Sequence, residues 1–176
     1  LLESVRLIKE LDSSICIIFA GPQVHTVEEE LLTANPGIDI IPTTFDPGEP
    51  ILLELVKRFV DGASLETVPG IIYRDCGVVV RTDPNSPPLN FEDAPSAYDL
   101  PDEVLFPEKD GRKYYAIIEP SRGCPFTCAF CFWGSGHKRN YFPLDRTLRD
   151  IEIAYNHPNV SAVYWTDSNI LGDKKS

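Results

Sequence analysis

The sequence of 176 residues contains no methionine and carries far fewer basic than acidic residues. Without methionine there is no initiator residue, so we expect the chain to be part of a longer polypeptide. No apolar run approaches the ~20 residues of a membrane-spanning helix, and no signal peptide is visible. The formal net charge of −11 argues against a nucleic-acid groove, where a basic surface would be expected. We therefore expect a cytoplasmic protein with neither nucleic-acid nor membrane partners.

Cysteine is scarce but clustered. Of five cysteines, three lie close together as Cys124, Cys128 and Cys131, a number that fits metal or catalytic chemistry in a reducing cytoplasm. A structural zinc site needs four protein ligands, and an electron-transfer [4Fe-4S] cluster usually has four cysteines. Three cysteines would leave one iron of a four-iron cluster open to a substrate or cofactor. The spacing therefore favours a catalytic iron–sulfur cluster.

Three other interpretations of this cluster remain open. The spacing i, i+4, i+7 also forms one face of a helix, so the cysteines could be core residues. However, Gly123 and Pro125 at its start and 134–136 after it favour a loop. Zinc is possible with His137 as the fourth ligand. A disulfide fits least well, because one of the three cysteines would be left unpaired.

Alternation of helical and strand patterns predicts half of a doubly wound α/β domain in residues 1–62. The continuously apolar run at 15–20 is typical of a parallel strand that is covered on both faces. The other expected elements are a helix over 1–11, a helix that begins with a capping box at 26–29, a strand over 38–41 and a helix that begins at Pro50.

A hairpin pattern at 70–81 and a connector at 82–113 with six prolines separate this region from a second β/α pattern. Strands are expected at 114–118 and 160–165, with an intervening helix whose apolar face carries Leu144, Leu148, Ile151 and Tyr155. The cysteines follow the first strand, and polar residues 166–169 follow the second. This order matches the start of a barrel whose chemistry sits at the carboxyl ends of its strands.

The cysteine motif in this position resembles that of radical S-adenosylmethionine (SAM) enzymes. The surrounding residues 119–134 are similar to the cobalamin-dependent branch, as is the order of an α/β domain, a proline-rich connector and a cysteine-bearing barrel. The resemblance implies the C-terminal half of a doubly wound, Rossmann-like cobalamin-binding domain over 1–69. A hairpin and connector over 70–113 and the first β/α units of a partial TIM barrel over 114–176 would follow.

The resemblance also implies roles for individual residues. Cys124, Cys128 and Cys131 would ligate three irons of a [4Fe-4S] cluster, and SAM would chelate the fourth. Electron transfer from the cluster would cleave SAM to methionine and a 5′-deoxyadenosyl radical. The residues expected to contact cofactors are Phe130 near the SAM adenine, Asp167 at its methionyl amino group, Arg122 at negative charge of the cluster or SAM, and Gly21 and Gly48 at cobalamin.

Each of these contact residues also has an ordinary structural interpretation. Phe130 could be loop core, Asp167 a helix N-cap, and Arg122 the partner of a surface acid. Gly21 and Gly48 could serve only their turns. No cobalt ligand can be named, because His25 is a lone histidine in a loop.

The function implied by the resemblance is cobalamin-dependent methylation of an unactivated carbon. A small-molecule or peptide substrate and an electron donor such as a flavodoxin or ferredoxin would be the partners. The alternatives are a tRNA methylthiotransferase-like radical SAM enzyme and a non-catalytic zinc-binding module. The acidic charge, and Cys16 as the lone cysteine of residues 1–62, argue against the tRNA-modifying enzyme.

Overall fold

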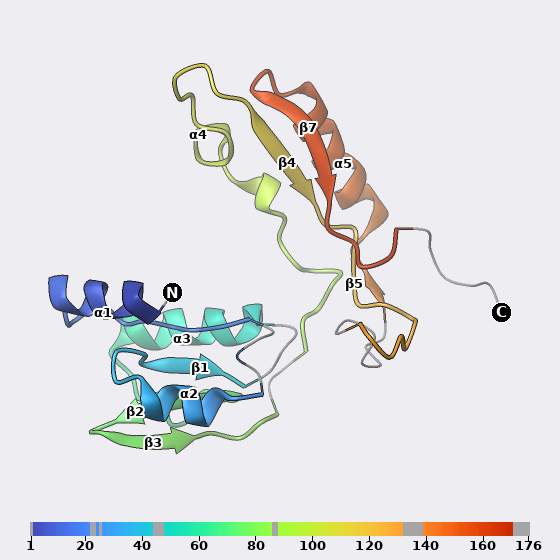
Figure 1. Ribbon diagram of the computed structural model, residues 1–176. Coiled ribbons are helices and arrows are strands. Elements are labelled where there is room, and N and C mark those ends of the chain that lie inside the picture. The colour runs from blue at the N-terminus through green and yellow to red at the C-terminus, as the bar shows by residue number, and fades with distance from the viewer. Residues whose placement is uncertain are drawn as a thin grey trace. The chain divides into compact units, whose positions relative to one another are not determined.

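The computed structural model describes residues 2–21, 24, 26–43, 48–85, 88–131 and 139–170. The chain divides into two compact units, Leu1–Leu89 and Asn90–Ser176, each of which is described by itself (Figure 1). No helix in the described part of the chain has both the length and the apolar character needed to cross a membrane.

The first unit is a three-stranded antiparallel sheet with helices on both faces. Its strands are β1 (Ile40–Pro42), β2 (Ile71–Asp75) and β3 (Val78–Arg81), in that order across the sheet. Its helices are α1 (Leu2–Leu11), α2 (Glu28–Ala34) and α3 (Glu49–Asp61). The predicted hairpin at 70–81 is therefore confirmed, and it belongs to the same sheet as β1.

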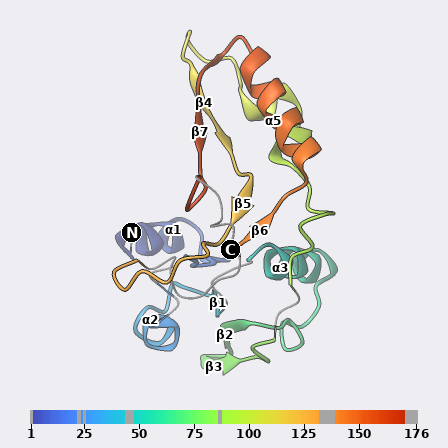
Figure 2. The ribbon, with the colours of Figure 1, turned by 90° about the vertical axis from the view of Figure 1, so that its right-hand side faces the viewer.

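Side chains alternate between two cores in this sheet, as the period of two requires. Figure 2 shows α2 and α3 on opposite sides of the strands. One core joins α1 and α2 to the sheet and comprises Val5, Val24, Leu32, Ile38, Ile41 and Ile72. The other joins α3 to the sheet and comprises Ile40, Ile51, Leu55, Val68, Ile71 and Tyr73. Helices thus cover both faces of this antiparallel sheet, but the run at 15–20, for which we expected such cover, forms none of its strands.

The segment predicted as a strand at 15–20 makes only one isolated parallel bridge, between Ile18 and Ile40. The carboxylate of Asp39 accepts a hydrogen bond from the backbone N–H of Ile17 at 2.7 Å and lies 2.7 Å from Lys9 Nζ. The side chain thus takes a donor that a continuous ladder would use. Cys16, which we predicted to be buried, is exposed.

The capping box predicted at 26–29 is wrong. Val27 occupies the N-cap position of α2, and no side chain caps the helix there. Acidic residues fill the first turn of α2 instead, at Glu28, Glu29 and Glu30. Such residues favour a helix N-terminus through its dipole rather than through a specific hydrogen bond.

The second unit is built on a parallel strand–helix–strand motif. Strands β4 (Tyr114–Ile118) and β7 (Val160–Trp165) pair in parallel, and α5 (Leu144–Asn156) connects them in sequence and packs against them (Figure 1). The boundaries of both strands match the sequence prediction. Ahead of β4, the connector forms a short 3₁₀ helix η1 (Ala97–Asp99) and a short helix α4 (Asp102–Leu105).

The apolar face predicted for α5 is largely wrong. Leu144 and Tyr155 are 71% and 81% exposed. The buried residues of α5 are Thr147, Asp150 and Ala154. Ala154 allows close packing against β4, and the Asp150 carboxylate accepts a hydrogen bond at 2.7 Å from Ser96 Oγ in the connector. A polar residue can therefore lie on the packed face, because a partner satisfies it.

Candidate metal centre

The segment that carries the three cysteines is closed at its base by a short antiparallel ladder. The two strands of the ladder are β5 (Ser121–Arg122) and β6 (Asn140–Tyr141) (Figure 2). The ladder extends by one further hydrogen bond of 3.0 Å, from the backbone N–H of Phe142 to the carbonyl oxygen of Pro120. Both ends of the cysteine segment are therefore held together directly after β4.

Gly123 connects this ladder to the first cysteine and has φ +87°, a conformation that favours glycine. Gly123 is also buried, so the turn into the cysteine segment is sterically confined. Cys124 and Cys131 are half-buried, Cys128 is exposed, and none of the three is in a disulfide. Cys131 donates its backbone N–H to the carbonyl of Cys128 at 3.0 Å.

The donor chemistry of this segment fits an iron–sulfur cluster, because three thiols that are free of disulfides lie on one segment whose ends are held together by the β5–β6 ladder. Within the described residues, no three side chains of ligand type converge into a ready metal-binding group. Metal binding and the folding of its ligand loop are generally coupled. The roles of Cys124, Cys128 and Cys131 as ligands remain a prediction.

Asp167 lies at the base of the cysteine segment. Its Oδ1 accepts a hydrogen bond from Ser121 Oγ at 2.5 Å, and its Oδ2 lies 3.9 Å from Arg139 Nη2. Arg139 Nε also donates to Ser121 Oγ at 3.0 Å. The expected meeting of the end of β7 with the cysteine segment is therefore observed. A contact between Asp167 and SAM remains a prediction.

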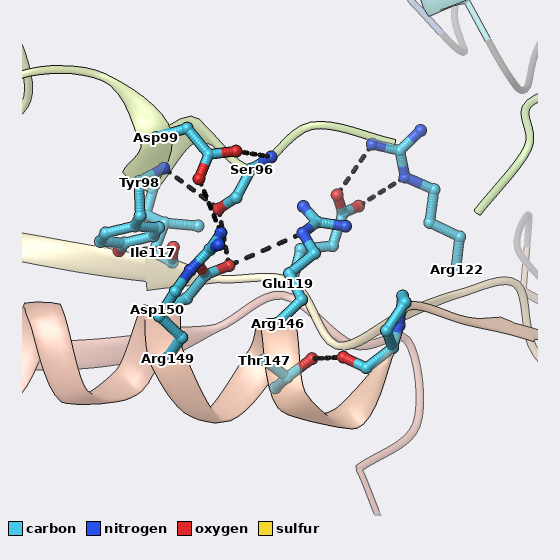
Figure 3. A network of polar contacts seen from close by, with 11 residues as sticks. Ser96, Tyr98, Asp99, Ile117, Glu119, Arg122, Arg146, Thr147, Arg149 and Asp150 are labelled. Atoms are coloured by element: carbon cyan, nitrogen blue, oxygen red, sulfur yellow. Dashed lines mark hydrogen bonds and ion pairs between the residues drawn. The ribbon is translucent and has the colours of Figure 1, made fainter. Parts of the chain in front are cut away.

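Arg122 forms a two-pronged ion pair with Glu119, shown in Figure 3, in which Nε and Nη2 each donate at 2.8 Å. Its guanidinium carbon also lies 5.5 Å from the centre of the Phe142 ring. The guanidinium carbon of Arg146 lies closer to the same ring centre, at 3.9 Å. The pairing with a nearby acid, one of the two interpretations open from the sequence, is thus present. The role of Arg122 towards the cluster or SAM remains a prediction.

The remaining predicted contact residues are exposed. Phe130 is 94% exposed, so it is not part of the loop core. Gly21 has φ +122°, whereas Gly48 has an ordinary helical conformation at the N-cap of α3. A Cβ at either glycine would meet nothing within 4 Å. Their contacts with cofactors remain predictions.

Two histidines considered from the sequence, His25 and His137, lie outside the described residues. Cys16 and Cys76 lie in the first unit and differ from typical ligand thiols. Although Cys16 is exposed as a residue, partial desolvation of its thiol, followed by the charge of Asp39, raises its pKa. A hydrogen bond with Asp75 raises the pKa of Cys76. Because the thiolate is the form that binds metal, both changes disfavour ligation.

Sequence reasoning did not identify Ser121 and Arg139 as partners of Asp167. Ser121 lies three residues before Cys124, and the sequence separates Arg139 from Asp167 by a helix and a strand. The pattern of polar residues at both ends of the cysteine segment was the available signal. Their pairing depends on parallel register between β4 and β7, which a single sequence does not define.

Comparison with known proteins adds independent information. No protein-family model matches the chain. The chain is 29% identical over 171 residues to the cobalamin-dependent radical SAM methyltransferase TokK of Streptomyces tokunonensis, a match that covers 93% of this chain and 24% of TokK. It is also 33% identical over 143 residues to an anaerobic magnesium-protoporphyrin IX monomethyl ester cyclase of Rubrivivax gelatinosus, with coverage of 74% and 24%.

A solved structure extends this likeness to the fold. The cobalamin-dependent SAM radical enzyme OxsB, solved with aqua-cobalamin and SAM bound, matches with a TM-score of 0.67 and 22% identity. The match covers 97% of this chain and 24% of OxsB. The chain spans about a quarter of the length of these relatives, so it corresponds to one part of each.

Proposed function

Because the chain belongs to the cobalamin-dependent radical SAM enzymes, we propose that it forms the cofactor-binding part of an enzyme that cleaves SAM reductively. The observation that carries this proposal is the tethered cysteine segment. Three thiols that are free of disulfides follow β4, beside the end of the parallel strand β7. This is the edge at which α/β barrels place their chemistry.

Each group of residues has a distinct task in this proposal. Cys124, Cys128 and Cys131 hold the cluster through their thiolates. When bound, a [4Fe-4S] cluster supplies the electron that breaks a carbon–sulfur bond of SAM. The β5–β6 ladder fixes where the cysteine segment leaves and rejoins the barrel unit. The ion pair with Glu119 orients Arg122, which directly precedes the turn at Gly123.

Methylation is the outcome that we propose for the reaction, with cobalamin as the methyl carrier. TokK is named a cobalamin-dependent methyltransferase, which supports this choice. The magnesium-protoporphyrin relative is named a cyclase, so the outcome needs its own test. The substrate is proposed to be a small molecule or peptide with an unactivated carbon. A flavodoxin or ferredoxin is the proposed electron donor.

Anaerobic reconstitution with iron and sulfide tests the cluster assignment. We expect bound iron and sulfide in the original protein and a loss of more than about tenfold in iron content for Cys128→Ala, because a thiolate ligand is removed. Cys76→Ala is the matched control and should retain its iron, since Cys76 lies at a hairpin tip in the first unit. Full cluster content in Cys128→Ala would refute the ligand assignment.

Incubation with hydroxocobalamin tests the cofactor that methylation requires. We expect the purified protein to retain cobalamin, visible by its absorbance, and to form a methylated product from SAM. A protein that holds its cluster and cleaves SAM but binds no cobalamin would exclude methylation by this route. It would leave a radical SAM enzyme without cobalamin as the function.

A further inference from the structure

Three buried polar side chains converge where the cysteine segment begins and ends. Ser121 is 2% exposed, and the side chains of Arg139 and Asp167 are each 5% exposed. The Ser121 hydroxyl donates to Asp167 Oδ1 at 2.5 Å and accepts from Arg139 Nε at 3.0 Å. We call Ser121, Arg139 and Asp167 the loop-base triad.

Each member of the loop-base triad comes from a different part of the second unit. Ser121 is in β5 and enters the cysteine segment, Arg139 directly precedes β6 and leaves it, and Asp167 follows β7. The triad therefore connects both ends of the cysteine segment to the neighbouring barrel strand. Two hydrogen bonds from Thr166 to the carbonyl of Ile118, at 3.1 Å and 3.3 Å, fix the end of β7 against the end of β4.

The surroundings of Asp167 are those of a residue already paired. One carboxylate oxygen accepts from Ser121 and the other lies 3.9 Å from the Arg139 guanidinium. A cation from a ligand would have to compete with this arginine for a carboxylate that has little exposed surface. Removing one member of a buried ion pair is costly, because its partner is left uncompensated.

We propose that Asp167 is a positioning residue, which fixes the base of the cysteine segment to the end of β7 through Ser121 and Arg139, and that it does not bind the SAM amino group directly. This inference rests on the proposed function for its consequence: the loop-base triad sets the geometry in which the three cysteines hold their cluster. Replacing a residue that orients metal ligands without touching the metal commonly lowers metal affinity by about 10- to 100-fold.

The test compares Ser121→Ala, Asp167→Asn and the double variant, with Ser161→Ala as the matched control. Ser161 is also a β-strand serine, but it is exposed and lies at the opposite end of β7, where its hydroxyl donates to the Tyr114 carbonyl. The first readout is amide hydrogen exchange in the cluster-free protein. We expect the amides of 121–122 and 139–142 to exchange about tenfold faster in both single variants, and no change in the control.

The second readout is made on the reconstituted protein. Ser121→Ala and Asp167→Asn should lose iron to a chelator at a similar rate, about tenfold faster than the original protein. The double variant should lose iron no faster than the more affected single variant, because each of the three variants breaks the same contact between Ser121 and Asp167. The electron paramagnetic resonance (EPR) spectrum of the reduced cluster should change in the same way in both single variants.

A different pattern would overturn the proposal. If Asp167 contacted SAM directly, Asp167→Asn would raise the SAM dissociation constant at least tenfold, while Ser121→Ala would leave amide exchange, iron loss and SAM affinity near those of the original protein. Because amide exchange needs no cluster, it still tests the loop-base triad if the protein takes up no iron and the proposed function fails. Ser121→Ala carries the test if Asp167→Asn gives too little folded protein.

Discussion

At Cys76, a single neighbouring residue, Asp75, raises the pKa of the thiol and so makes it a poorer metal ligand. Cys76 lies in the turn between β2 and β3 with φ +46°, next to Gly77 with φ +85°. The hydrogen bond and the negative charge of Asp75 raise the pKa of the Cys76 thiol. At a given pH the thiolate fraction of Cys76 is therefore reduced, although the side chain is exposed.

We predict that Asp75→Asn will accelerate alkylation of Cys76 by iodoacetamide at pH 8. The change removes the carboxylate whose hydrogen bond and negative charge raise the pKa of Cys76, so more of the thiol is ionised, and the thiolate is the reacting form. The difference should disappear at a pH above both pKa values, where the thiol is ionised in either protein. Peptide mapping by mass spectrometry measures the rate at Cys76.

Asp61→Asn serves as the control, because it alters another exposed carboxylate, at the end of α3. It should leave the rate at Cys76 unchanged. Equal rates for Asp75→Asn and the original protein at pH 8 would show that the carboxylate does not govern this thiol.

At the residue scale, the sequence predicts which chemical group a position supplies better than it predicts which residue that group contacts. The tethered thiols and the possible pairing of Arg122 with an acid follow from local sequence, since Glu119 is only three residues away. The partners of Asp167 do not, because Ser121 is 46 residues away in the chain. Contacts of that kind depend on strand register.

At the scale of elements, the connector is part of the second unit. Figure 3 shows Ser96 hydrogen-bonded to Asp150 of α5 and Asp99 paired with Arg149 of the same helix. Ser96 also caps η1: its hydroxyl accepts a hydrogen bond from the backbone N–H of Tyr98, and its own backbone N–H donates to the Asp99 carboxylate. The proline-rich sequence correctly suggested little regular structure, but not that the segment packs against α5.

We predict that Ser96→Ala will destabilise the protein by about 1–3 kcal/mol, because it leaves the buried Asp150 carboxylate without its hydroxyl donor. The free energy of unfolding can be measured by urea denaturation followed by circular dichroism. Ser161→Ala, which removes an exposed hydroxyl, should change it by less than about 0.5 kcal/mol. If the two variants are equally stable, the Ser96–Asp150 contact does not hold the connector on α5.

In the second unit, the strands were easier to predict than the buried face of the helix. β4 and β7 are short apolar runs with clear ends, and their predicted limits match the structure. For α5, apolar periodicity favoured Leu144, Leu148, Ile151 and Tyr155. Of these four, Ile151 packs against the core and the others are exposed. The buried residues of the helix are Thr147, Asp150 and Ala154. The deciding factors were a small side chain and a long-range hydrogen bond, which periodicity does not measure.

For the whole molecule, the division into two units falls between Leu89 and Asn90, inside the connector predicted over 82–113. The hairpin belongs to the first unit, and the connector from Asn90 onwards belongs to the second. The sequence-based boundaries at 69 and 113 marked changes of composition. Composition does not reveal which unit an irregular segment packs against, so the assignment of 1–69 to cobalamin remains a prediction.

The proposed cluster, held by three cysteines, has one iron open to SAM. EPR spectroscopy of the anaerobically reconstituted and reduced protein, recorded with and without SAM, reports on that iron. We predict the spectrum of a reduced [4Fe-4S] cluster that shifts when SAM is added, and loss of that spectrum in Cys128→Ala. A spectrum that SAM does not alter, or a protein that binds zinc and no iron, would contradict it.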